Sequence, residues 1–151
     1  MADISEELIT YLKTVSGVTA LVGTGTSARI YDEDGLPAGV LNPTQAGPTR
    51  GAISFVKQSD NNSGHLGGRS TLNSASFAMT CYAVTPSARN ALASALWDAL
   101  APEATQTMGS TAIAEIHCQN KSTTTDLPAS DASDQRIYLA LASYTIWYYS
   151  A

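Results

Sequence analysis

Apolar residues near the N-terminus recur every three or four positions, the spacing that places side chains on one face of a helix. The residues that follow this spacing are Ile4, Leu8, Tyr11, Leu12 and Val15. Asp3 stands at the N-cap position, and the two glutamates after it lie in the first turn, where the helix dipole favours negative charge. The pattern predicts an amphipathic helix over residues 4–15, followed by a short helical turn over residues 18–22.

The same spacing returns in the middle of the chain, directly after a Thr-Pro pair. Thr85 is suited to cap a helix, and Pro86 fits the first helical position because its missing N–H is not needed there. The apolar stripe of this helix consists of Leu92, Leu96, Ala99 and Leu100. Trp97 lies off the stripe, about 140° from Leu92 at 100° per residue. We expect Trp97 either at a subunit contact or at the rim of the core.

Elsewhere apolar and polar residues alternate, which is typical of strands with one buried face. The longest alternating run is 72–84, where one face carries Ala75, Phe77, Met79, Cys81 and Ala83. Shorter runs predict strands over 28–31, 52–57 and 111–118. Residues 135–149 form a last strand that is apolar on both faces. Such a strand lies centrally in a sheet, or places one face against another subunit.

The expected elements follow the order helix, strand, strand, strand, helix, strand, strand. This order predicts an α+β fold: a largely antiparallel sheet of about four to five strands, with two main helices packed on one face and long hairpin loops. The length of 151 residues fits a single domain over residues 1–151. Within it we expect loops 58–70 and 119–135 to be flexible, because turn-forming and small polar residues dominate them.

Composition and charge mainly exclude classes of function. The net charge is −5 and the few basic residues are scattered, which argues against nucleic-acid binding. No apolar run approaches the roughly 20 residues that a membrane helix needs. Charged residues make up only 14% of the chain, well below the roughly 25% of typical soluble domains. The small neutral polar residues that replace them suit close protein–protein packing.

The segment QSDNNSGHLGGR, residues 58–69, is a candidate phosphate loop because of its three glycines. It lacks the GxxxxGK[ST] spacing and the lysine of a P-loop. A strand follows it, so no helix N-terminus is available to bind a phosphate. We therefore expect a flexible hairpin arm that becomes ordered against an adjacent subunit or ring.

The remaining candidate chemistry rests on four residues: His65, Cys81, His117 and Cys118. They lack the carboxylate neighbours and the CxxC spacing of a metal site. His117 and Cys118 are adjacent in a strand, so their side chains point to opposite faces and exclude a dyad between them. A pair of Cys81 and His117 on neighbouring strands stays open. We expect no catalytic residue, no cofactor and no metal ion.

The order of elements, together with SGVTALVGTGTSARIY at residues 16–31 and SARNALASALWDAL at 87–100, resembles a known family. It is similar to the tail terminator proteins of long-tailed bacteriophages, also called tail completion or head–tail joining proteins. The resemblance covers residues 4–149. It implies an α+β subunit of the virion, assembled in the host bacterial cytoplasm as a hexameric ring.

The resemblance also implies partners. The ring would cap the tail tube, end its polymerisation and bind the head–tail connector, while genomic DNA passes through the lumen without sequence-specific binding. A negative net charge suits such a lumen. Two alternatives stay open: another neck or tail-tube virion protein, or a small enzyme or ligand-binding domain that uses Cys81, His117 or His65. The proposed functional residues are interface residues in the two long loops, the second helix and the aromatic last strand: His65, Arg69, Trp97, Lys121, Asp126, Arg136, Trp147 and Tyr149.

Overall fold

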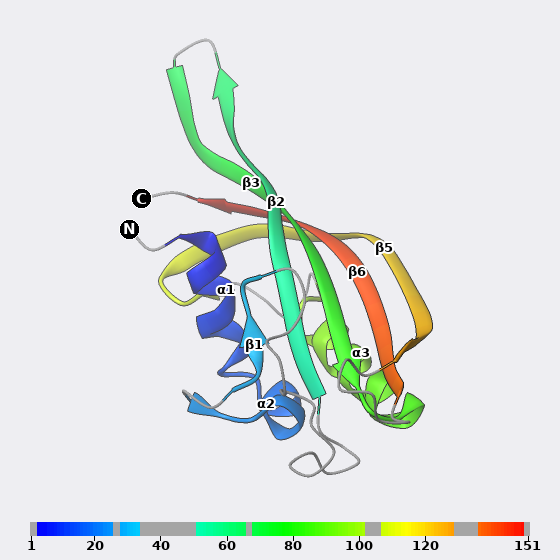
Figure 1. The fold of residues 1–151 in the computed structure, drawn as a ribbon. Coiled ribbons are helices and arrows are strands. Elements are labelled where there is room, and N and C mark those ends of the chain that lie inside the picture. Colours follow the sequence, from blue (N-terminus) through cyan, green and yellow to red (C-terminus); the bar gives the residue numbers. More distant parts are fainter. Residues whose placement is uncertain are drawn as a thin grey trace.

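The computed structural model describes residues 3–25, 28–33, 51–65, 68–101, 107–128 and 136–149. Within these residues, three helices and six strands follow one another (Figure 1). Their bounds are α1 Ile4–Leu12, α2 Ser16–Val22, β1 Ile30–Tyr31, β2 Gly51–His65, β3 Gly68–Ala83, α3 Pro86–Ala99, β4 Thr107–Met108, β5 Thr111–Pro128 and β6 Arg136–Tyr149. The α+β class is therefore confirmed.

The strands form one curled sheet in the order β1-β2-β3-β6-β5-β4. The short β1 runs parallel to β2, and every other neighbouring pair is antiparallel. The sheet has one or two strands more than the four to five expected, partly because β4 is only two residues long and carries no readable pattern. A third helix, α2, was expected only as a short turn.

Both main helices begin at the residues that the sequence indicates. The Asp3 carboxylate accepts a hydrogen bond from the N–H of Ser5 at 3.0 Å, and the Thr85 hydroxyl accepts one from Ala88 at 3.1 Å. Such caps satisfy N–H groups that have no partner inside a helix. The first helix ends earlier than expected, at Leu12.

All three helices lie on the same side of the sheet (Figure 1). The core between them contains four of the five β3 residues that were predicted to share a face, together with the stripe of α3: Ala75, Phe77, Met79 and Cys81 of β3, and Leu92, Leu96, Ala99 and Leu100 of α3. Phe55 and Phe77 meet edge to face near its centre, with ring centroids 5.7 Å apart. The burial of apolar area here is the main source of stability.

The last strand, β6, lies between β3 and β5, so the predicted central position is confirmed. Its even-numbered residues, among them Tyr144 and Ile146, face the helices. On the other face, Leu139 packs with Ala52 and Tyr82 in a second, smaller apolar cluster. These two clusters explain why the strand is apolar on both sides.

Glu7 has a role that its sequence position does not reveal. Instead of lying on the surface near the helix dipole, its side chain is only 7% exposed. Its two carboxylate oxygens accept hydrogen bonds from the N–H of Ser110 at 2.7 Å and from its hydroxyl at 3.2 Å. Glu7 thereby joins α1 to the turn between β4 and β5. Gly109 in this turn has φ = 57°, and a Cβ there would collide with the Glu7 carboxylate.

Three strands, β2, β3 and β5, are longer than the sequence predicts. Residues 58–65 and 68–70, expected as a loop, continue β2 and β3, and residues 119–128 continue β5. Residues 129–135, the rest of the second expected loop, lie outside the described residues. No helix in the described part of the chain is long and apolar enough to cross a membrane.

Candidate interface surfaces

The ends of β2 and β3 project beyond the rest of the sheet (Figure 1). Pairing between them continues to His65 and Gly68, whereas β6 stops at Tyr149, opposite Leu72. Near the start of this projection the Asn62 side chain donates to that of Asn73 at 2.9 Å. We call residues 62–73 the arm. His65 and Arg69 lie in it, but their side chains are outside the described part of the structure.

A polar cluster fastens the base of the arm to the domain. Lys57 Nζ contacts the Asp3 carboxylate at 3.0 Å and the Asp60 carboxylate at 3.3 Å. The Tyr148 hydroxyl donates to Asp60 at 2.7 Å. Burial and this acceptor raise the pKa of Tyr148. For Lys57, burial acts to lower the pKa, but the hydrogen bonds to Asp3 and Asp60 outweigh it and leave the pKa raised. The sequence analysis noted Lys57 only as one of several scattered charges.

Trp97 and Lys121, both predicted as interface residues, come together in the structure. Lys121 Nζ lies 4.6 Å from the centre of the Trp97 ring, a cation–π contact that joins α3 to β5. Trp97 is half-buried and Lys121 is exposed. They line a cavity of about 290 Å³ whose floor includes Cys118 and Tyr144. The Tyr144 hydroxyl is buried, makes no hydrogen bond of good geometry with the described residues, and has its pKa raised by burial and by the nearby Cys118 thiol.

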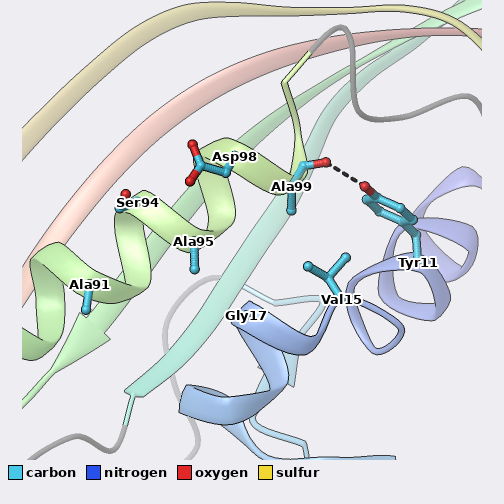
Figure 2. Close-up of a pocket in the computed structure, with 8 residues that line it drawn as sticks. All are labelled: Tyr11, Val15, Gly17, Ala91, Ser94, Ala95, Asp98 and Ala99. Carbon is cyan, nitrogen blue, oxygen red and sulfur yellow. Dashed lines mark hydrogen bonds between the residues drawn. The ribbon is translucent and has the colours of Figure 1, made fainter.

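A second hollow of about 540 Å³ lies between α3 and the α1–α2 connection (Figure 2). Its walls are mostly small or apolar, with Val15, Ala91 and Ala95 among them, and Asp98 adds one carboxylate. The Tyr11 hydroxyl at its end already donates to the carbonyl of Ala99 at 2.6 Å. This hollow offers mainly shape and apolar surface.

The face of the sheet away from the helices is composed mainly of small neutral residues along its centre. Register places Ser76, Ala78, Thr80, Ser143 and Thr145 there side by side. Trp147 and Tyr149, two predicted anchors, lie on the same face near the end of β6, and Tyr149 is 47% exposed. Asp126 and Arg136 lie at the opposite end of the β5–β6 pair, and their side chains are outside the described part.

The residues considered for catalysis are not brought together. Cys81 is buried on the helix side of β3, and β6 separates it from β5, where His117 is paired with Thr145 on the other face. Burial raises the pKa of Cys81 to about 12, which removes thiolate reactivity at neutral pH. The structure therefore excludes the Cys81–His117 pair that the sequence left open. Among the residues that the structure describes, no group of three or more His, Cys, Asp or Glu side chains could hold a metal ion.

Comparison with known proteins identifies the fold. No protein-family model matches the chain, and no curated protein matches it. A chain in the solved structure of the virion of a native gene transfer agent particle superposes with a TM-score of 0.64. The match covers 95% of this chain and 92% of that chain at 16% sequence identity. At this identity the likeness shows a shared fold over nearly the whole length of both chains.

Proposed function

We propose that the protein is a structural component of a phage-like virion, and that it acts as a tail terminator. The observation that carries the proposal is the end-to-end match to a chain from a gene transfer agent virion. The resemblance of residues 16–31 and 87–100 to tail terminators supports the finer role independently, since it rests on the sequence. In this role six copies form a ring that caps the tail tube and binds the head–tail connector.

The described residues are more consistent with assembly than with catalysis. The hollow beside α3 and the α1–α2 connection is lined mostly by apolar and small side chains, and β6 separates the two residues of the one pairing considered for thiol chemistry. The arm, the Trp97–Lys121 contact and the neutral sheet face are surfaces that other subunits could cover. Trp and Tyr, which are favoured at the centres of interfaces, occur at two of them.

Electron microscopy of the purified protein, alone and mixed with tail tubes, tests this function. A terminator forms single rings and occupies one end of each tube, so tubes assembled with it stop at a defined length. A tail-tube protein would instead appear in many stacked rings, and a neck protein would bind the connector without shortening tubes. A protein that stays monomeric at high concentration and never associates with tubes would contradict the structural role.

A further inference from the structure

Two long strand edges lie on opposite sides of the sheet. Within the described ranges, β1 pairs with the outer edge of β2 only at Ile53 and Ser54. In the same ranges, β4 pairs with the outer edge of β5 only at Thr111 and Ala112. We call residues 55–61 the β2 edge and residues 113–123 the β5 edge. Their outward N–H and C=O groups are a template for pairing with another chain.

The two edges lie at the same height in the sheet. Followed across the register, Phe55, Met79, Ala142 and Lys121 stand in one row. A second row runs from Asn61 through Ser74 and Trp147 to Glu115. Copies placed side by side would therefore bring the two edges together without a large vertical shift.

Strand direction determines which edges are complementary. Because β2–β3, β3–β6 and β6–β5 are all antiparallel, β5 runs opposite to β2. A neighbour that adds its β2 beside β5 therefore continues the antiparallel order. The contact joins two different surfaces, so it repeats head to tail and closes into a ring when the rotation allows.

We propose that the β5 edge of each subunit pairs with the β2 edge of the next, so that the sheets join into one continuous β-structure around the ring. This inference rests on the proposed ring function and names the surface that builds it. Exposure supports it, because Glu115, His117 and residues 119–123 of β5 are exposed to solvent in the isolated subunit. The irregularities after Cys118 and Lys57 limit pairing to short registered segments, which opposes uncontrolled aggregation.

The direction of individual N–H groups gives a backbone test. The Ile53 N–H donates to the Arg29 carbonyl at 2.9 Å and so points away from β3. In antiparallel strands, opposite residues alternate between hydrogen-bonded and non-bonded pairs. Carried across the rows, this alternation points the N–H of Lys121 away from β6, toward the β5 edge. Proline is tolerated at such an edge position and removes the outward donor.

The Lys121→Pro variant is therefore expected to fold as a monomer with an unchanged circular dichroism spectrum. Its yield of rings should be at least tenfold lower than that of the wild type. Lys121→Ala is the matched control, because it removes the ammonium group and its contact with Trp97 but keeps the N–H. Rings that form equally well with proline would overturn the pairing. Equal loss of rings in both variants would assign the effect to the side chain and overturn it as well.

Cysteine cross-linking tests the pairing without relying on proline. In a Cys118→Ser background, Asn61→Cys is combined in turn with Glu115→Cys, His117→Cys or Asn120→Cys, all on the helix-free face. The two edges of one chain are three strand spacings apart, about 14 Å, so a disulfide between them must join two subunits. Asn61→Cys with Ser94→Cys on α3 is the control, since Ser94 is exposed but lies on a helix.

Oxidation is expected to give a ladder of covalent oligomers with at least one edge pair and none with the control. If rings are seen by microscopy but no edge pair cross-links, the pairing is wrong while the ring function stands. If cross-linked rings stack along whole tubes, the pairing stands and the terminator role is wrong. If neither rings nor ladders form, both proposals fail.

Discussion

The Asp3 carboxylate holds the start of α1 and the base of the arm at once. It accepts from Ser5 and contacts Lys57 Nζ with both oxygens. The hydrogen bond from the Ser5 N–H, assisted by Lys57, lowers the pKa of Asp3 below its ordinary value of 3.8. A carboxyl group with a lowered pKa stabilises the folded state above its unfolded pKa. That contribution is lost as the pH falls through the folded pKa.

Asp3→Ala is expected to lower the free energy of unfolding by about 1 kcal/mol at pH 7, the usual cost of losing an N-cap. Urea denaturation from pH 7 to pH 2 measures it. The difference between the two proteins should shrink at the acid end, where wild-type Asp3 is protonated. Asp3→Asn keeps a cap acceptor without the charge. At pH 7 its free energy of unfolding should lie between those of the wild type and Asp3→Ala. A difference that does not change with pH would show that the charge contributes nothing.

The buried contact between Glu7 and Ser110 can be tested against Glu6, which is exposed in the same helical turn. Glu7→Ala leaves the Ser110 N–H without its acceptor, so we expect a loss of about 2 kcal/mol in the free energy of unfolding. Glu7→Gln keeps one oxygen acceptor and should lose less. Glu6→Ala, the exposed neighbour in the same turn, should change stability by less than about 0.5 kcal/mol. Similar losses for Glu6→Ala and Glu7→Ala would contradict the role of Glu7.

At the scale of elements, side-chain pattern predicts those elements whose faces differ in polarity. The caps at Asp3 and Thr85 and the alternation of β3 could all be read from the sequence. The C-terminal halves of β2 and β5 could not be predicted, because polar residues occupy both of their faces and leave no alternation to recognise. Likewise Trp97 could be recognised as lying off its stripe, but Lys121, 24 positions further along the chain, gave no local sign of contact with it.

The Trp97 contact gives a prediction about α3. Trp97 is half-buried, so removing its ring costs the core less than removing a fully buried residue. We expect Trp97→Ala to reduce the equilibrium constant of ring assembly at least about tenfold, as the loss of an interface anchor does. The equilibrium constant of folding should fall by a smaller factor. Sedimentation and urea denaturation measure the two effects. Trp97→Phe, which keeps an aromatic ring, should retain assembly. Equal losses of assembly and of folding would place Trp97 in the core.

The arm is expected to serve joining and not folding. Replacing residues 63–70 by Asn-Gly leaves a four-residue connection between the paired Asn62 and Asn73, a common hairpin length, and keeps every pair between β3 and β6. The free energy of unfolding should change by less than about 1 kcal/mol, while binding to tail tubes or to the connector is lost. A second variant replaces residues 63–70 by eight alternating Ser and Thr residues. It keeps the length of the arm but not its sequence, and so tests whether length alone is sufficient for joining. Unfolding of the shortened protein would show that the arm packs as part of the core.

At the scale of the whole molecule, the sequence predicts well which face of the sheet is buried. It predicts poorly which strand edges are left to pair with another chain. Burial on the helix side follows from the properties of single residues, such as the apolar row of β3. The two edges can be identified only when the strand order is known. β6 lies between β3 and β5, so the order of strands in the sheet differs from their order along the chain. The edge of β5 therefore had no signal in the sequence, although it is the surface on which the ring proposal depends.

The two cysteines report on folding and on this edge separately. Burial raises the pKa of Cys81 to about 12 from 9.0, so the thiol stays neutral in the folded protein. Its stabilising effect is complete below pH 9 and is lost as the pH rises toward 12. At pH 8 we expect iodoacetamide to modify half-buried Cys118 in the free subunit. Cys81 should react only on global unfolding, slower by at least about 10³ for a domain stable by 5 kcal/mol.

Ring assembly should then change the two rates differently. Cys118 lies within the β5 edge, so pairing with a neighbour should slow its modification. Cys81 should also slow, but only as far as assembly stabilises the fold, and urea should restore its reaction at the unfolding midpoint. Mass spectrometry of alkylated peptides measures both rates in one sample. If assembled rings leave the Cys118 rate unchanged, the neighbour does not cover the β5 edge, whatever surface holds the ring together.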